Sequence, residues 1–143
     1  MFFSQNRNQL RQAYYDAWLK FTQQLPMTML EQQIAKVIEE HPEYHALINN
    51  IDKDYLPEEG QSNPFLHMGM HLALREQINT NRPAGIHQCF IVLSTRLASA
   101  LEAEHQMMEC LGHALWLAQQ QSSAPNEVEY LNCLRKLADI DPG

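Results

Sequence analysis

The sequence has few basic residues and no long apolar run. Its 10 Lys and Arg stand against 17 Asp and Glu, which gives a formal net charge of -7 at pH 7. Because phosphate groups are bound by concentrated positive charge, this balance argues against nucleic acid as a partner. No apolar stretch approaches the roughly 20 residues that a membrane-spanning helix needs, and the sequence turns polar at Ser4, before a secretory segment could form. We therefore expect a soluble, cytoplasmic protein with no nucleic-acid or membrane partner.

Cysteine is also scarce, and the common catalytic motifs are missing. The three cysteines, Cys89, Cys110 and Cys133, are an odd number without a CxxC pair, which suits buried, reduced thiols in a cytoplasm. The chain contains no GxSxG, no P-loop and no GxGxxG. Serine hydrolases, P-loop nucleotidases and Rossmann dinucleotide-binding proteins therefore have no support in the sequence.

The first third of the chain shows helical periodicity. Apolar residues recur every three or four positions over 10–25, and Pro26 ends that segment. Thr28 followed by Glu31 forms a capping box, which predicts the start of a second helix. Pro42 ends or kinks this helix, or opens a new one at its first turn.

The remaining residues predict further helices and one long loop. Residues 51–62 are rich in charge and turn formers and form the predicted loop. Helices are predicted over 63–79, from about 83–85 to about 121 with a restart or a kink at Ser99, and from Pro125 through Leu137. The fold class is therefore all-α, a bundle of five to six helices in a single domain over residues 1–143.

Seven histidines are present, and two of them lie one helical turn apart in the segment NPFLHMGMHLALREQ. On a helical wheel His67 and His71 share the apolar stripe of the helix predicted over 63–79. Both rings should therefore point into the bundle, where imidazoles on adjacent turns can bind one metal ion. Zinc enzymes with HExxH use the same spacing, although HMGMH lacks their glutamate.

A second group lies in the predicted helix that runs to about 121. Glu109 follows His105 by one turn, and His113 lies at the edge of the same face. This helix is apolar nearly all round, so a carboxylate inside it needs a metal ion or a histidinium as its partner. We therefore expect His105 and Glu109 to face the same interior as the first group.

The segment HPEYH adds two histidines. His45 joins the interior if this segment forms a helical turn. His41 precedes Pro42, where extended geometry is favoured, and we expect it to converge less readily. The sequence thus predicts a metal site whose ligands come from His67, His71, His105, Glu109, His45 and His113.

Two interpretations of the histidines are open. Imidazoles with one carboxylate suit a divalent transition metal, with iron or zinc favoured over nickel or manganese and all four over magnesium or calcium. In the alternative, the histidines form a polar core network in a non-catalytic interaction or scaffold protein. The sequence names no substrate and leaves open whether the protein is an enzyme, and its apolar faces also allow a homodimer.

The spacing of the predicted ligands matches the residue pairs of one kind of di-iron bundle and only part of the motif of a second. HxxxH and HxxxE pairs are found in hemerythrin-like four-helix cores, and His67/His71 and His105/Glu109 match them. The helix order differs from that pattern, and the later histidine–aspartate pair is missing. A ferritin-like site needs two ExxH motifs, of which only the one formed by Glu102 and His105 is present. A mononuclear site is equally open.

At HPEYH, NPFLHMGMHLALREQ and ECLGHALWLAQ the chain resembles a family of small uncharacterised bacterial proteins. The resemblance covers nearly the whole length, from the aromatic first helix to YLNCL. The family pattern places an acidic residue at the position of His113. The resemblance implies an all-helical, cytoplasmic bacterial protein of unknown function.

Overall fold

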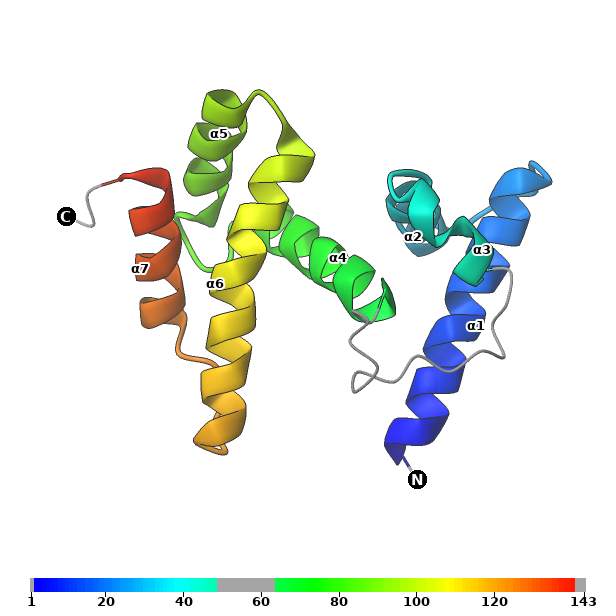
Figure 1. Ribbon diagram of the computed structural model, residues 1–143, viewed down its shortest axis with the longest axis horizontal. Coiled ribbons are helices and arrows are strands. Elements are labelled where there is room, and N and C mark those ends of the chain that lie inside the picture. Colours follow the sequence, from blue (N-terminus) through cyan, green and yellow to red (C-terminus); the bar gives the residue numbers. More distant parts are fainter. Residues whose placement is uncertain (1, 49–63, 141–143) are drawn as a thin grey trace. The chain divides into compact units, whose positions relative to one another are not determined.

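The computed structural model describes residues 2–48 and 64–140, which form helices and contain no strand (Figure 1). The elements are α1 (Phe2–Thr22), α2 (Met29–Glu39), the 3₁₀ helix η1 (Pro42–Tyr44), α3 (His45–Ile48), α4 (Pro64–Thr80), α5 (Ile86–Leu97), α6 (Ala100–Gln120) and α7 (Glu127–Ala138). The all-α prediction is confirmed, with α3 a single turn beside six longer helices. The loop predicted over 51–62 lies outside the described residues. In the described part of the chain, no helix has the length and apolar character needed to cross a membrane.

The chain divides into two compact units, Met1–Leu72 and Ala73–Gly143. Their boundary falls inside α4, so this one helix contributes its first half to the first unit and its second half to the second. The prediction of a single domain over 1–143 stays a prediction.

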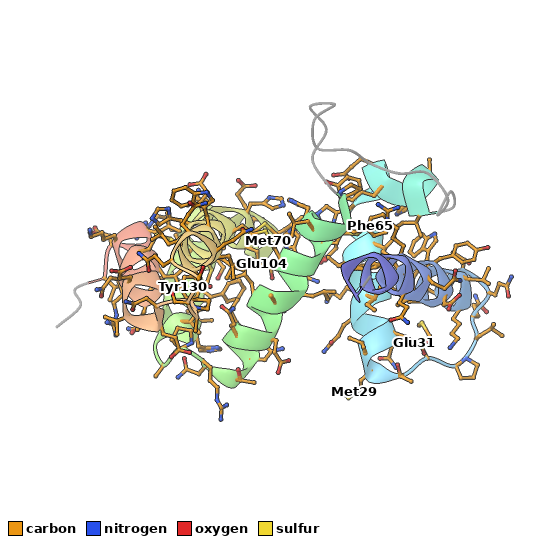
Figure 2. The ribbon with its side chains drawn as sticks, turned by 90° about the horizontal axis from the view of Figure 1, so that it is seen from below. Met29, Glu31, Phe65, Met70, Glu104 and Tyr130 are labelled. Atoms are coloured by element: carbon orange, nitrogen blue, oxygen red, sulfur yellow. A yellow bond between two sulfur atoms is a disulfide. The ribbon has the colours of Figure 1, made fainter. Side chains whose placement is uncertain are left out.

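The first unit packs α1, α2, α3 and the start of α4 around one apolar core. Tyr14 of α1 lies edge-on to Phe65 of α4, which Figure 2 labels, with ring centroids 5.5 Å apart. The predicted capping box of α2 is confirmed: Thr28 Oγ1 accepts from the Glu31 N–H at 3.1 Å, and Glu31 Oε1 accepts from the Thr28 N–H at 2.8 Å. Lys20 of α1 donates to the same glutamate at 2.6 Å. The fully buried members of the core include Tyr14, Ala17, Val37, Ile38, Ile48 and Met68.

In the second unit α5, α6 and α7 pack against one another. Ala98 adopts the left-handed conformation, with φ of 54°, and ends α5. Ser99 is extended and caps α6, because its side chain accepts from the Glu102 N–H at 3.0 Å. Of the two options that the sequence left open at Ser99, the structure therefore has the restart. The last helix begins at Glu127 rather than Pro125, since the Asn126 side chain provides its N-cap.

Two side-chain contacts join the second half of α4 to α6 and α7. Arg75 binds the carboxylate of Glu104 with Nε at 3.0 Å from Oε2 and Nη2 at 3.1 Å from Oε1. The Tyr130 hydroxyl donates to Gln77 Oε1 at 2.7 Å. Figure 2 labels Glu104 on α6 and Tyr130 on α7. Because Glu104 is only 4% exposed, its charge depends on a partner such as this guanidinium.

Cys110 of α6 and Cys133 of α7 form a disulfide, with their Cα atoms 5.8 Å apart. The prediction of reduced thiols is therefore wrong for this pair. The two residues are separated by 23 positions, so their meeting depends on how α6 packs against α7 rather than on a local motif. Cys89 is buried and free, and burial raises the pKa of its thiol, as predicted for an inert core cysteine.

We expect the two units to unfold together, because α4 continues as one helix through Leu72 and Ala73 and neither half can lose its packing without fraying the other. The variants Trp116→Phe and Trp18→Phe each leave one tryptophan, in the first and the second unit respectively. In urea, the fluorescence midpoint of each variant should coincide with the far-UV circular dichroism midpoint of the same variant. Two separated midpoints would instead show two independent domains.

Removal of the buried charge on α6 should lower stability far more than removal of an exposed one. We expect Glu104→Gln to reduce the free energy of unfolding by about 3 kcal/mol, because Arg75 loses its carboxylate partner. Glu109→Gln on the same helix is the matched control, and should change it by less than about 0.5 kcal/mol since Glu109 is exposed. Urea unfolding of both variants measures the difference, and equal effects would contradict a stabilising role for the pair.

Candidate metal centre

Three histidines of the first unit bring their rings together. His41 follows α2, and His67 and His71 lie in the first half of α4. The ring centroids are 5.1 Å apart for His41 and His67, 4.8 Å for His41 and His71, and 4.9 Å for His67 and His71. One nitrogen from each ring lies within 4.8 Å of the others. His71 is fully buried and His41 nearly so, so this histidine group offers three nitrogen donors at a sheltered position.

The two histidines of α4 are positioned by the helix itself. Pro64 begins α4 at a position where its missing N–H costs no intrahelical hydrogen bond. His67 and His71 then follow with the i, i+4 spacing that puts them on one face, as the sequence predicted. Their Nε2 atoms are 3.3 Å apart. A helix alone is therefore sufficient to bring two of the three donors together.

His41 is positioned by the end of α2. Its backbone N–H donates to the Ile38 carbonyl at 3.0 Å, while its ring Nδ1 lies 2.7 Å from the Val37 carbonyl oxygen. A carbonyl can only accept, so Nδ1 carries the ring proton and Nε2 of the neutral imidazole carries the lone pair. This tautomer is the one in which Nε2 can bind a metal ion.

Sequence reasoning placed His41 outside the site, and the structure places it inside the histidine group. The backbone at His41 is neither helical nor fully extended, with φ of -127° and ψ of 69°, so the extended geometry expected before Pro42 is not reached. With this conformation α2 ends, and the His41 ring folds back onto the last helical turn instead of pointing away from it. The signal in the sequence was the pair His-Pro after an apolar helix, because a histidine there can reach the unsatisfied terminal carbonyls.

His45, which the sequence predicted as a ligand, does not belong to the histidine group. Its Nε2 lies 2.9 Å from the Ile38 carbonyl oxygen and therefore carries the proton. Its ring packs on Trp18 of α1, with centroids 4.6 Å apart. This histidine thus serves as a second cap at the end of α2, where a polar hydrogen also interacts well with the helix dipole.

Tyr44 forms part of the surroundings of the histidine group. Its ring stacks on that of His41, with centroids 5.5 Å apart and an angle of 5° between the planes, and lies 6.1 Å from that of His67. Burial, and to a smaller extent the charge of Glu43, raises the pKa of Tyr44. The phenol therefore stays protonated at neutral pH and can donate a hydrogen bond.

The other two predicted histidines lie on α6, in the second unit. Nδ1 of the partly buried His105 is 3.6 Å from Oε2 of Glu102, one turn earlier on the helix. His113 is exposed, and its ring stacks on Trp116 with centroids 6.2 Å apart and an angle of 22° between the planes. The roles of both histidines as metal ligands stay predictions.

The expectation of a buried carboxylate at Glu109 is wrong, because this residue is exposed. Glu104, five residues earlier, is the buried acidic residue of α6, and its charge is bound by Arg75. A helical wheel cannot show which side of α6 is buried, because this helix is apolar nearly all round. Which of the two glutamates is buried therefore depends on how α6 packs against its neighbours.

Comparison with known proteins identifies a family but no activity. No curated protein and no solved structure matches this chain. A family model matches residues 6–136, a range that includes all three members of the histidine group. The predicted membership of an uncharacterised family is thereby confirmed. The chain belongs to the family described as Domain of unknown function (DUF1841).

Proposed function

We propose that this protein binds a divalent transition-metal ion through His41, His67 and His71. The observation that carries the proposal is the convergence of three imidazoles, with one nitrogen from each within 4.8 Å of the others. Histidine is the commonest protein ligand for transition metals, and imidazole nitrogen suits zinc, iron and nickel better than magnesium or calcium. Within this set we favour zinc or iron, with nickel and manganese as further candidates.

The distance between the donors on α4 agrees with this choice. A tetrahedral zinc ion with Zn–N bonds of about 2.05 Å holds its ligand nitrogens about 3.3 Å apart. The Nε2 atoms of His67 and His71 are 3.3 Å apart. The spacing of this pair on the helix therefore already suits one ion.

The hydrogen bond between His41 and Val37 supports the same proposal. Metal-binding histidines commonly donate their second ring N–H to a carbonyl or carboxylate, which fixes the tautomer and the ring orientation. Here the Nδ1 atom of His41 lies 2.7 Å from the carbonyl oxygen of Val37. His41 thus has the hydrogen-bonding pattern expected of a ligand that binds through Nε2.

Three histidine ligands leave one position of a tetrahedral ion for water, a substrate or a fourth side chain. A metal ion with such a position lowers the pKa of bound water and polarises carbonyl or phosphoryl oxygens. The phenol of Tyr44, next to two of the rings, would supply a hydrogen-bond donor there. His105 remains our proposal for a fourth ligand on the basis of the sequence.

The alternative function is a non-catalytic interaction protein whose histidines form a polar core network. One observation favours it: at 3.3 Å, Nε2 of His67 and Nε2 of His71 are close enough for a hydrogen bond between the two rings. Such a network would satisfy the buried imidazoles without any ion. The two functions differ in what the removal of His71 does to the metal-free protein.

The first test is elemental analysis of protein purified without a polyhistidine tag or chelator. We expect close to one zinc or iron ion per chain. His71→Ala should lower metal affinity by more than the roughly 10- to 100-fold that loss of an outer-shell partner causes. His87→Ala is the matched control, because His87 is an exposed histidine of the second unit and its removal should leave the metal content unchanged. His105→Ala distinguishes four histidine ligands from three.

Wild-type protein that stays empty after reconstitution with zinc, ferrous, nickel and manganese ions would rule out the metal centre. The alternative is tested in the presence of chelator, where urea unfolding compares wild type with His71→Ala. A large loss of stability in the metal-free variant would support the polar network. If His71→Ala is less stable than wild type only in the presence of metal, that result would support the metal centre. The reason is that an ion that binds only the folded state raises the free energy of unfolding.

A further inference from the structure

The second unit contains a cavity of about 380 Å³ between α6 and α7, and the Cys110–Cys133 disulfide lines it. Cavities of this size typically hold small organic ligands. The α6 side presents small and apolar side chains such as Ala114 and Leu117. The α7 side presents polar ones, among them Glu129 and Lys136. A disulfide bond, apolar side chains and charged groups of both signs therefore line one cavity, all within the second unit.

The two cysteines of the disulfide differ in how far they are exposed as residues. Cys110 is 4% exposed, whereas Cys133 is partly exposed. Lys136 follows Cys133 by one turn and His113 follows Cys110 by one turn, and both also line the cavity. Cys133 is thus the more exposed of the two cysteines, and Lys136 lies one turn from it on α7 at the same cavity.

We propose that this cavity receives a low-molecular-weight thiol derived from an amino acid, which exchanges with the disulfide at Cys133. The thiol loses its proton, and its thiolate attacks Sγ of Cys133 as the Cys110–Cys133 bond breaks. The electron pair of that bond goes to Sγ of Cys110, which takes up the proton that the attacking thiol released. The products are a mixed disulfide at Cys133 and a free thiol at Cys110. A second molecule of the same thiol then releases the first as its oxidised dimer and leaves two reduced cysteines.

The charges at the cavity determine the class of thiol. Lys136 can bind a carboxylate and Glu129 can bind an ammonium group, and both side chains line the cavity with the disulfide. An amino-acid-derived thiol carries both groups, while a neutral thiol carries neither. The proposal is independent of the histidine group, which lies in the other unit.

The test uses the full chain purified without reductant. Denatured, unreduced protein should contain one titratable thiol per chain, that of Cys89, and three would contradict the disulfide. Reduced glutathione is then added, samples are quenched with acid, and peptide mass spectrometry locates the adduct. We expect the glutathione adduct on Cys133. Reduction with the adduct on Cys110, or no reduction at all, would overturn the proposal.

The charge of Lys136 is tested by the rate of reduction. We expect Lys136→Gln to slow reaction with glutathione about three- to fivefold, the effect of losing one partly exposed ionic contact, and to leave reaction with neutral 2-mercaptoethanol unchanged. Lys36→Gln removes an exposed charge from α2 and is the matched control. Equal slowing with both thiols, or equal slowing in both variants, would overturn recognition at this cavity.

A second variant keeps the test valid if Lys136→Gln folds poorly. Cys110→Ser leaves Cys133 as a partly exposed thiol, which should form a mixed disulfide with oxidised glutathione. The matched variant Cys133→Ser leaves the buried Cys110 and should react at least about tenfold more slowly, since a buried sulfur is less accessible to the attacking reagent. Equal rates in the two variants would contradict attack at Cys133.

Discussion

The hydrogen bond between the ring of His41 and the carbonyl of Val37 is the contact on which the histidine group depends. Proline cannot donate a backbone N–H, so α2 ends before Pro42 and its last carbonyls need other donors. The ring of His41 provides one at 2.7 Å, and the ring of His45 provides another for Ile38 at 2.9 Å. The same bond that completes the helix end also fixes which nitrogen of His41 carries a lone pair. The end of α2 thereby places a metal-binding nitrogen of His41 beside His67 and His71 of α4.

α4 combines two functions in one continuous helix. Its first half carries His67 and His71, whose rings face the end of α2 within the first unit. Its second half carries Arg75, which binds the buried Glu104 of α6, and Gln77, which accepts from a tyrosine of α7. Rigid helices hold functional side chains more accurately than loops do, so His67 and His71 benefit from their place on a helix.

The disulfide changes what the cysteine content implies. A structural disulfide suits an oxidising compartment, whereas a bond that exchanges with small thiols follows the redox state around it. The placement of Cys133 at a cavity with Lys136 favours the second behaviour. The cytoplasmic location of the protein stays a prediction.

The sequence by itself determined those features that depend on neighbours within about one helical turn. The all-α class, the capping box of Thr28 and Glu31 and the shared face of His67 and His71 all arise from contacts between residues three or four positions apart. Tertiary structure decided the rest. The ring of His41 meets two rings of another helix, Arg75 selects a glutamate 29 residues away, and two cysteines pair across 23 residues. Periodicity shows that a helix has a buried face but not which helix covers it, and that choice comes from packing.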